Sequence, residues 1–318
     1  MFWGMKYVVL FSFFLLLPFC VKAQTDGAYI RAFPQEFTIR PYFYYKFTSL
    51  ETDIKGKEQM SYMPNIPVGV GIGFTYKNYA LNLAYAPPFF RDKEKGKTQY
   101  YDLQYHYYSR KYLFDLFFQD YKGFYSDYDK VKKLYPSYPD MHIIQYGATG
   151  QYVFNHRKFS YRAAFYNNEK QVRSASSFQV GGGFYYNKLY TEETAILAGR
   201  DRFRNYQLSI TGGYVYTWVF KKDYFFTFGL TGGINLGLEN IRYSGEQLEV
   251  TPNLFPRVAG GYNGDDWALS FNFVMNQVYV TRSGDMNVIF NTARMNLCYV
   301  RRLNWSPGIL KKNRFLNR

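Results

Sequence analysis

Short segments in which apolar and polar residues alternate recur along most of the chain, and this period of two limits the possible folds more than any other feature. Apolar side chains occupy every second position from Val68 to Tyr76, and the stretch from Tyr79 to Tyr85 resumes the alternation after Lys77-Asn78. Successive side chains of a β-strand point to opposite faces, so this region predicts a β-hairpin with one apolar face. A chain built mainly of such segments is expected to be all-β.

Thirteen segments have this strand pattern, and each is close to the length of about ten residues that a membrane-spanning strand needs. They are 37–47, 68–76, 79–86, 98–109, 112–124, 141–153, 159–166, 177–190, 205–220, 224–237, 255–262, 267–281 and 287–302. Tight turns are expected at 77–78, 110–111, 155–158, 221–223 and 263–265, and long polar loops facing outward at 48–67, 87–97, 125–140, 167–176 and 238–254. Because single-chain bacterial barrels have an even number of strands, we expect twelve, or fourteen if a further strand lies between 188 and 204.

The N-terminal segment has the three parts of a secretory signal peptide. Lys6 provides a positive charge, the residues from Tyr7 to Phe19 form a short apolar stretch, and the small residue Ala23 precedes Gln24. Signal peptides of this kind are removed on export. We therefore expect a signal peptide over residues 1–23, with cleavage between Ala23 and Gln24.

The remaining residues, 24–318, are expected to form a single domain, because no linker or change of composition divides them. They contain no run of about 18 uninterrupted apolar residues, which excludes a membrane-spanning helix. A closed antiparallel barrel satisfies its backbone hydrogen bonds without water, and the 35 Tyr and 31 Phe exceed what a water-facing β-domain displays. We therefore expect one transmembrane antiparallel β-barrel in the bacterial outer membrane, with strands over 37–302 and a basic tail over 303–318.

The chain is strongly basic, with 39 Lys and Arg against 24 Asp and Glu and a net charge of +15. Loss of Lys6 and Lys22 with the signal peptide would leave +13. In an exported membrane protein this charge favours contact with anionic lipid, including lipopolysaccharide phosphates, or a lumen that attracts anions, and not nucleic acid. The barrel assembly machinery and small solutes are further expected partners. Cys298 is the lone cysteine of the expected mature chain, which excludes an internal disulfide.

Polar residues that alternate with apolar neighbours in the expected strands are predicted to face the lumen. They are Arg40, Asp102, Gln104, Asp115, Gln119 and Arg162. Charged side chains on the inner face of a barrel either line a water path or pair with one another. The sequence therefore leaves two alternatives open, a conducting lumen and a polar network that fills it.

The sequence shows no constellation typical of an enzyme, a cofactor site or a metal site. His106, His142 and His156 are scattered, and no metal-ligand spacing of histidine, cysteine and carboxylates is present. A lipid hydrolase would need a histidine beside a nucleophile, and the available pairs are His106 with Ser109 and His142 with Ser160. Without a Gly-x-Ser-x-Gly motif, we predict neither catalysis nor a bound cofactor.

Several short motifs together resemble one protein family. They are Phe37-Thr38-Ile39-Arg40, Tyr62-Met63-Pro64-Asn65, the segment from Gly69 to Lys77, Asp102-Leu103-Gln104, Tyr121-Lys122-Gly123-Phe124-Tyr125, Pro139-Asp140-Met141, Lys158-Phe159-Ser160-Tyr161 and Asn168-Glu169. Over most of its expected mature length the chain is similar to an uncharacterised outer-membrane β-barrel family of the Bacteroidota, catalogued as domain of unknown function 4421. The resemblance implies a barrel in the outer membrane and supplies no reaction or ligand.

Three functional hypotheses follow from the sequence. The first is a passive channel or an envelope-structural barrel, which the polar inner faces favour. The second is a barrel-embedded lipid hydrolase, which depends on the two histidine pairs. The third is a surface ligand-binding or adhesion protein acting through its long extracellular loops, especially 125–140, where Tyr125, Asp127, Asp129 and Asp140 are the candidate contacts.

Overall fold

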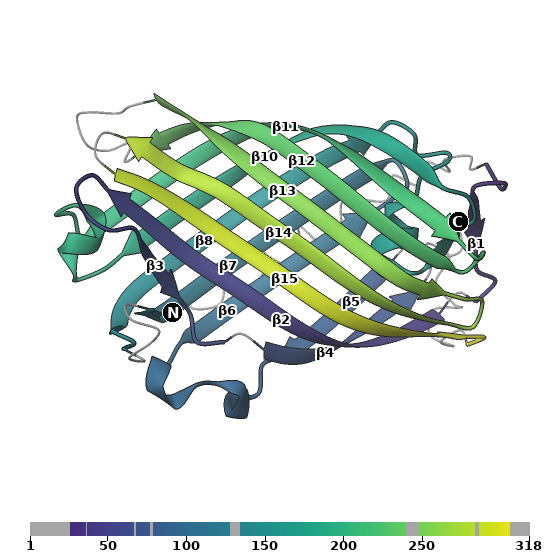
Figure 1. The fold of residues 1–318 in the computed structure, drawn as a ribbon, viewed down its shortest axis with the longest axis horizontal. Helices are drawn as coiled ribbons and strands as arrows, with labels where there is room; N and C mark the ends of the chain where they lie inside the picture. Colours follow the sequence, from purple (N-terminus) through teal and green to yellow (C-terminus); the bar gives the residue numbers. More distant parts are fainter. Residues whose placement is uncertain are drawn as a thin grey trace, which may run out of the picture.

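The computed structural model describes residues 26–35, 37–66, 68–76, 79–127, 134–239, 248–283 and 286–305. Fifteen strands and four short helical segments lie along this part of the chain (Figure 1). The strands are β1 (Ile30–Ala32), β2 (Phe37–Ile54), β3 (Met60–Met63), β4 (Val68–Tyr76), β5 (Tyr79–Tyr85), β6 (Gln99–Tyr108), β7 (Tyr112–Ser126), β8 (Ser137–Val153), β9 (Glu169–Gln171), β10 (Ala175–Tyr190), β11 (Arg202–Phe220), β12 (Tyr224–Glu239), β13 (Leu248–Asn263), β14 (Trp267–Ser283) and β15 (Met286–Leu303). The helical segments are η2 (Pro88–Phe90), η3 (Lys93–Lys95), η4 (Arg162–Tyr166) and η5 (Thr194–Leu197).

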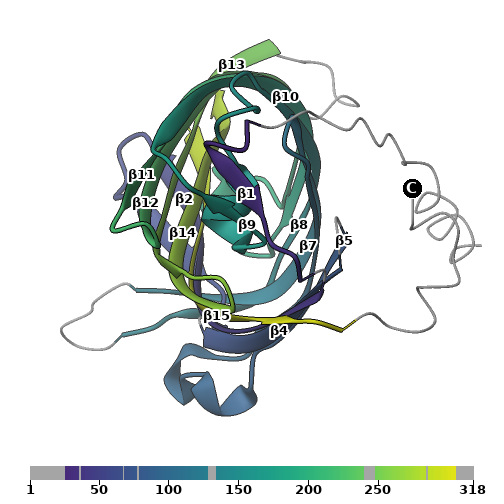
Figure 2. The ribbon, with the colours of Figure 1, turned by 90° about the vertical axis from the view of Figure 1, so that its right-hand side faces the viewer.

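Ten antiparallel strands close into a ring, which confirms the predicted all-β barrel. The order around the ring is β2, β3, β7, β8, β10, β11, β12, β13, β14 and β15, and β15 pairs back with β2. Figure 2 looks along the barrel and shows interior segments within the ring. Three further strands, β4, β5 and β6, widen the same sheet to thirteen strands, within the predicted range of twelve to fourteen.

The outer face of the wall is apolar, whereas the inner face is polar or closely packed. On β11, Tyr214 and Trp218 are 42% and 46% exposed, but Val215 and Thr217 between them are buried. The neighbouring strand β12 exposes Phe226 in the same way. An apolar exterior around a sheet whose backbone is hydrogen-bonded internally is suited to contact with lipid. Among the described residues no helix has the length and apolar character needed to cross a membrane.

The two ends of the barrel differ in their connections. Short turns join β6 to β7, β11 to β12 and β13 to β14 at one end, where β2 begins and β15 ends. We refer to this end as the turn end; it lies on the right in Figure 1. The connections from β2 to β3, β5 to β6, β7 to β8 and β10 to β11 lie at the opposite end, the loop end. Outer-membrane barrels carry their short turns on the periplasmic side, so the turn end is expected to face the periplasm.

One side of the wall is split. Both β3 and β4 run antiparallel to β2, and β3 ends at Met63, directly before Pro64, because proline cannot donate to a strand ladder. At the loop end β3 bridges β2 and β7, whereas at the turn end β4 pairs with β5 and β7 pairs with β6. Within the described residues β5 and β6 are not paired with each other. The wall therefore has ten strands at the loop end and twelve at the turn end, with two unpaired edges.

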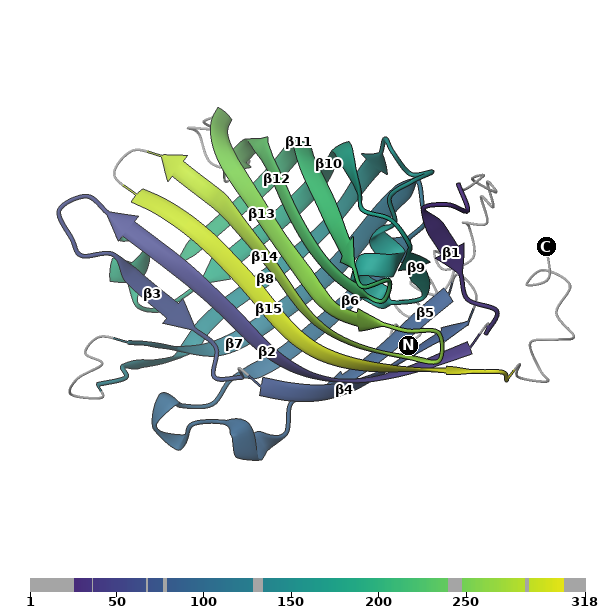
Figure 3. The ribbon, with the colours of Figure 1, turned by 45° about the vertical axis from the view of Figure 1, so that its right-hand side comes forward.

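A buried asparagine holds the connection between β5 and β6. Asn65 is 2% exposed, and its Nδ2 donates to the backbone oxygens of Asp92 at 2.6 Å and Gly96 at 2.7 Å. Its Oδ1 accepts a hydrogen bond from the Asp92 N–H at 3.2 Å. This connection, which includes η2 and η3, projects from the side of the barrel in Figure 3. Side-chain hydrogen bonds therefore fix a segment that strand pairing does not reach.

The prediction of a strand over 159–166 is wrong. Its last five residues form the π-helical turn η4, and Phe159, Tyr161 and Phe165 are buried inside the barrel. Aromatic residues at every second position are the pattern of a strand with one apolar face. Here the segment folds back into the lumen, where apolar side chains surround it on several sides, so the pattern does not require a strand. The consecutive Ala163-Ala164 interrupts the alternation and permits the tight turn.

Several predicted connections must be corrected. A turn does form at 155–158, where the Lys158 N–H donates to the Asn155 backbone oxygen at 3.0 Å, but it leads into the segment inside the barrel and not to another wall strand. The outward loop expected at 167–176 belongs to this interior segment as far as residue 174, includes β9, and passes into the wall strand β10 at Ala175. No extra strand lies over 188–204, because η5 occupies the connection between β10 and β11. The loops expected at 48–67, 125–140 and 238–254 are shorter, since β2, β3, β7, β8, β12 and β13 extend into them. Backbone hydrogen bonds maintain strand pairing, so a ladder continues through polar residues that no longer alternate.

Candidate functional site: a plugged lumen

Residues 154–174, which connect β8 to β10, fold back into the turn end of the barrel, and we refer to them as the plug. Strand β9 of the plug pairs with β1, so two segments far apart in the sequence meet inside the barrel mouth (Figures 2 and 3). Phe159, Tyr161 and Ala164 are between 0% and 2% exposed and pack in one cluster with wall residues such as Val215. The plug therefore places an apolar layer across the lumen.

A buried carboxylate fixes the plug to the wall. Glu169 is 2% exposed, and its Oε1 accepts a hydrogen bond from Arg110 Nε at 2.9 Å and lies 3.4 Å from Arg162 Nη1. Its Oε2 accepts a hydrogen bond from the Ser160 hydroxyl at 2.7 Å. Arg110 belongs to the turn between β6 and β7, whereas Arg162 and Ser160 belong to the plug. Moving the plug out of the barrel would separate this buried carboxylate from Arg110, and the loss of a charged partner is unfavourable.

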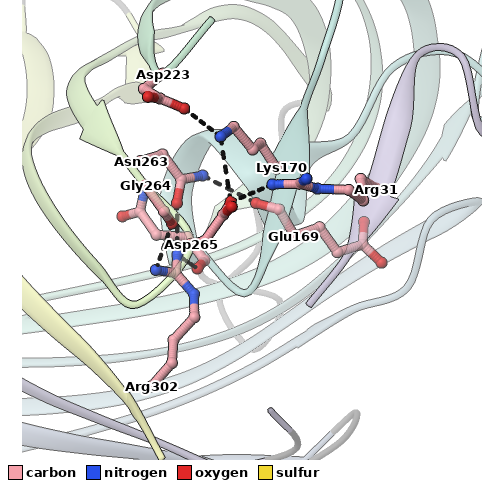
Figure 4. A network of polar contacts seen from close by, with 9 residues as sticks. Arg31, Glu169, Lys170, Asp223, Asn263, Gly264, Asp265 and Arg302 are labelled. Carbon is pink, nitrogen blue, oxygen red and sulfur yellow. Dashed lines mark hydrogen bonds and ion pairs between the residues drawn. The ribbon is translucent and has the colours of Figure 1, made fainter. Parts of the chain in front are cut away.

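A second set of charges joins the interior segments to the turns (Figure 4). Lys170 pairs with Asp223 of one turn, and its Nζ lies 3.4 Å from Asp265 Oδ1 of the next. Arg31 of β1 also pairs with Asp265. Burial acts to raise the pKa of the Asp265 carboxyl, but Lys170 and Arg31 outweigh it and hold the pKa below its usual value. The plug and β1 are thus attached to the rim by ion pairs.

Arg302, near the end of β15, contacts the rim and both interior segments (Figure 4). It is 3% exposed, and its guanidinium donates to the backbone oxygens of Gly264 at 2.8 Å and Asn167 at 2.6 Å. Its Cζ lies 3.6 Å from the centroid of the Phe33 ring. Nearby, Asn263 Nδ2 donates to the backbone oxygen of the plug residue Glu169 at 2.9 Å. The last strand of the barrel therefore takes part in closing the mouth.

Apolar side chains also cover the lumen near the loop end. Ile196 and Leu197 of η5 are 4% and 0% exposed and belong to a cluster with wall residues from distant strands, among them Met141 of β8 and Val288 of β15. Asp140 holds this connection, because its Oδ2 accepts a hydrogen bond from a backbone N–H of the connection at 2.5 Å. The lumen therefore has an apolar layer near each end.

Between these layers, polar side chains lie in register across neighbouring strands. This polar row consists of Asp102, Gln119, Gln145, Asn187 and Asn205, on β6, β7, β8, β10 and β11. Gln145 Nε2 donates to Asn187 Oδ1 at 2.5 Å. Asn205 is 0% exposed, and neither polar atom of its amide has a hydrogen-bond partner among the described residues. Buried amides normally bond to protein or water, so the middle of the lumen is a hydrophilic environment.

An ion pair beside the polar row crosses the split side of the wall. Lys46 of β2 pairs with Asp102 of β6, and the two side chains are 7% and 16% exposed. The Tyr121 hydroxyl accepts from Lys46 Nζ at 2.7 Å and donates to Asp102 Oδ2 at 2.9 Å. Gln104 and Gln119 donate to the other carboxylate oxygen at 3.0 Å and 3.3 Å. This network links two strands that have no direct strand pairing.

Charges from three wall strands reach one residue of the plug, Tyr166. Arg40 of β2 lies with its Cζ 4.8 Å from the centroid of the Tyr166 ring. Burial raises the pKa of the Tyr166 hydroxyl, while the positive charges of Arg40, Arg257 and Arg294 act in the opposite direction. Arg257 of β13 approaches through Tyr108, because its Nη1 lies 3.4 Å from the Tyr108 hydroxyl and the Tyr108 and Tyr166 ring centroids are 5.2 Å apart. Together with Arg294 of β15, these arginines bring positive charge from separate parts of the wall to the plug.

Residues 24–301 match the model of the family described as a domain of unknown function, DUF4421. The chain belongs to the DUF4421 family. The family resemblance of the short sequence motifs is thus confirmed. No curated protein matches this DUF4421 chain.

Solved structures similar to the DUF4421 barrel include outer-membrane-expressed OmpT of Vibrio cholerae, with 9% identity, a TM-score of 0.31, and coverage of 83% of this chain and 98% of that one. A bacterial polysaccharide outer membrane secretin has 6% identity, a TM-score of 0.33 and coverage of 85% and 99%. The toluene transporter TodX of Pseudomonas putida has 7% identity, a TM-score of 0.27 and coverage of 86% and 90%. At this level of similarity none of them informs on the function of the DUF4421 chain.

The location of the DUF4421 protein follows from its own architecture. A closed antiparallel sheet with an apolar exterior satisfies the backbone in lipid, and bacteria place such barrels in the outer membrane. The protein is therefore an outer-membrane β-barrel in contact with lipid.

The residues predicted to face the lumen occupy two settings in the DUF4421 barrel. Those on the inner face of wall strands are Arg40 on β2, Asp102 and Gln104 on β6, and Asp115 and Gln119 on β7. Arg162 instead belongs to the plug, where it faces Glu169. Its expected place on a strand is wrong because the segment 159–166 is not part of the wall.

The four loop candidates are not a single loop. Tyr125 is 9% exposed in β7, and Asp140 lies in β8, so both belong to strands that extend past their expected ends. Asp127 directly follows β7, and Asp129 lies outside the described residues. The expectation of a 125–140 loop must therefore be reduced to the connection between these two strands.

Several residues of the site were missed from the sequence. Arg294 and Arg302 lie on β15 in phase with the inward-facing Cys298, so the alternation rule that selected Arg40 could have selected them. Glu169 and Lys170 gave no comparable signal, because they lie in a segment that returns into the barrel, which alternation does not predict.

The histidine pairs considered for a lipid hydrolase are not assembled. His106 Nδ1 lies 2.6 Å from Asp115 Oδ1, but Ser109 bonds within its own turn. His142 is on β8 near the loop end, whereas Ser160 is in the plug at the turn end. Across the described ranges, no group of three His, Cys, Asp or Glu side chains is arranged to hold a metal ion.

Proposed function

We propose that this protein is a normally closed outer-membrane channel for small polar solutes, and that its plug moves when solute passes. The polar row from Asp102 to Asn205, enclosed between two apolar layers, is the observation that carries the proposal. Burying polar groups without hydrogen-bond partners is unfavourable, so a barrel with a purely structural role would gain stability from apolar residues there. The proposal takes the passive channel from the hypotheses that the sequence left open and adds a gate to it.

The plug is suited to act as a gate because side-chain contacts hold it in the mouth. The Lys170 ion pairs and the Arg302 hydrogen bonds can be exchanged for contacts with water at the rim. Both ends of the plug continue into wall strands, β8 and β10, so the segment stays attached to the barrel when these contacts break.

An envelope-structural barrel is the second candidate function. It is favoured by the buried Glu169, which has two arginine partners and would be difficult to displace. The histidine–serine pairs are not assembled and give no support to lipid hydrolysis. Among the described residues of the β7–β8 connection, no contact favours surface binding. Lipopolysaccharide phosphates and the barrel assembly machinery remain expected partners of a basic outer-membrane barrel.

Planar-bilayer conductance of the purified, folded protein tests the proposal. The plug variant replaces residues 156–173 with a short glycine-serine turn that directly joins the ends of β8 and β10. We expect rare, brief openings in the wild-type protein and sustained current steps in the plug variant, because the apolar layer at the turn end is removed. A milder variant, Arg302→Gln, should lengthen the openings of the wild type.

Lys222→Ala serves as the control, because it removes an exposed positive charge from the same rim. It should leave the current unchanged. A retained heat-dependent shift in gel mobility shows that the plug variant is folded. If the folded variant still passes no current, the channel proposal is rejected and the structural barrel is favoured.

A further inference from the structure

We infer that Arg40, Arg257 and Arg294 form a lumenal binding site for an anion of the phosphate or carboxylate class. The inference deepens the proposed channel function by naming the class of solute. Its claim that this solute is transported rests on the proposed function. Binding itself can be measured in a barrel that never conducts.

Two of these arginines lack an acidic partner. Arg40 is 8% exposed and donates to the neutral Asn82 Oδ1 at 2.5 Å. Arg294 Nε donates to the neutral Asn296 Oδ1 at 2.9 Å, and the guanidinium lies 4.4 Å from the centroid of the Tyr44 ring. In the part of the chain that the structure describes, neither guanidinium forms an ion pair with a carboxylate. Arg40 is buried and Arg294 is half-buried, and a charge removed from water is normally paired, so these two arginines indicate an anion that the protein itself does not provide.

The third arginine is only partly satisfied. Arg257 Nη2 lies 3.9 Å from Asp115 Oδ2, and Nη1 is 3.4 Å from the Tyr108 hydroxyl. Its Nε is buried without a hydrogen-bond partner among the described residues. Asp115 is shared, because its other oxygen lies 2.6 Å from His106 Nδ1. One carboxylate at this distance does not complete the hydrogen bonding of Arg257.

The balance of charge on this part of the inner face is positive. Its cations are Arg40, Lys46, Arg257 and Arg294, and its carboxylates are Asp102 and Asp115. Lys46 and Arg294 are direct cross-strand neighbours, and like charges in that position repel. A bound anion would reduce this repulsion and offset the two positive charges in excess.

The geometry around Arg294 favours a planar or tetrahedral oxyanion. Gly69 and Gly71 of β4 leave room for the rings of Tyr44 and Tyr42, since an added Cβ would lie 2.3 Å and 2.2 Å from the nearest ring atoms. Arg294 lies over both rings, 4.4 Å and 5.6 Å from their centroids. These contacts with the rings position the guanidinium, and its Nη groups, which have no acceptor among the described residues, suit two-point contact with phosphate or carboxylate oxygens.

The same oxyanion chemistry has two sources. A soluble phosphate or carboxylate can arrive through the lumen. A lipid headgroup can arrive through the split wall, because Asn82, the partner of Arg40, is on β5, whose far edge is unpaired within the described residues. The outward-facing Leu81 and Leu83 on that strand are 58% and 53% exposed, which suits contact with acyl chains.

Calorimetric titration of the folded full-length barrel in a zwitterionic detergent with inorganic phosphate tests the site. Wild-type protein should bind phosphate, and Arg294→Gln and Arg40→Gln should each weaken binding about tenfold or more, the loss expected for a charge-assisted pair. Arg294→Lys should bind with intermediate affinity, since it keeps the charge but not the planar fork. The matched control is Arg202→Gln, at an exposed arginine at the start of β11 outside the cluster, which should bind as the wild type does.

A parallel experiment distinguishes the sources. Wild-type and Arg294→Gln protein are reconstituted in nanodiscs of phosphatidylglycerol or phosphatidylcholine, and native mass spectrometry counts the lipids that remain bound. If the wild type retains phosphatidylglycerol preferentially and the variant does not, the ligand is a lipid headgroup. If the protein binds phosphate but shows no such lipid retention, the ligand is a soluble anion. Either result supports the site. The site is overturned if the protein binds neither phosphate nor lipid. It is also overturned if the folded wild type and both glutamine variants bind equally, whatever the conductance experiment shows.

Discussion

The continuous side of the wall, from β8 to β15, and the split side, from β2 to β7, are stabilised in different ways. On the continuous side each strand pairs with a neighbour on both edges, as β11 does with β10 and β12. On the split side β5 and β6 each pair on one edge among the described residues, and the side chains of Asn65, Lys46 and Asp102 link the parts. Where backbone pairing is interrupted, stability depends on individual polar side chains, and single substitutions should reveal this.

Loss of the ion pair across the split should have the largest effect. Lys46→Met leaves the buried Asp102 carboxylate without its cation, and we expect the free energy of unfolding to fall by about 3–5 kcal/mol. Urea unfolding in lipid vesicles measures the change. Lys46→Met combined with Asp102→Leu should recover most of the loss, because no unpaired charge remains.

The matched substitution on the continuous side is Thr217→Val, which breaks the hydrogen bond between the buried hydroxyls of Thr217 and Thr227 at 2.7 Å. We expect a loss of only about 1 kcal/mol there. Equal losses for Lys46→Met and Thr217→Val would contradict the contrast between the two sides.

Substitution of the asparagine that holds the β5–β6 connection should give the second-largest loss in the free energy of unfolding. Asn65→Ala removes three part-buried hydrogen bonds to the backbone of that connection, and we expect a loss of about 2–3 kcal/mol. The same urea unfolding, with limited proteolysis of the connection, measures the effect. Gln59→Ala, in the exposed turn between β2 and β3, should change neither quantity by a measurable amount.

Glycine substitutions sharpen the comparison at the level of the backbone. Gly123 on β7 has φ +88°, and an added Cβ would lie 2.3 Å from the backbone oxygen of Lys97. We expect Gly123→Ala to destabilise the barrel by about 1–3 kcal/mol. Gly212→Ala on the continuous β11, where a Cβ would meet nothing within 4 Å, should be neutral or slightly stabilising. Similar changes in both thermal midpoints would show that the split side is not specially constrained.

The smallest expected effect concerns pH and the rim of the continuous side. Because the pKa of Asp265 is lowered in the folded protein, its contribution to stability is present above the unfolded value, near 3.8, and is lost as the pH falls through the folded value. Asp265 is exposed, so we expect Asp265→Asn to cost less than about 1 kcal/mol at pH 7. The difference between wild type and variant should shrink as the pH falls through the folded value. A stability difference that does not change with pH would show that the Asp265 charge is not its cause.

The sequence predicted the wall better than its contents. Period-two alternation locates strands because lipid on one side and lumen on the other impose it, and β4 was placed without error over Val68–Tyr76. The plug lies inside the barrel, where both apolar and polar partners are available. The alternation that includes Phe159 and Tyr161 therefore matched the pattern of a strand, although no strand forms there. Of the site residues, Arg40 and Asp102 could be found by alternation, but Glu169 could not, since its partners come from another turn and from the plug itself.

The closure at the turn end also fixes an order of events in biogenesis. Strand β1 comes from the start of the described chain, β9 from its middle, and Arg302 from its last strand, and all three meet at one mouth. A chain that lacks its final strand has neither the β2–β15 seam nor the Arg302 contacts. The seal is therefore completed only when the last strand has been delivered, so that the turn end of an unfinished barrel lacks contacts that the finished barrel has.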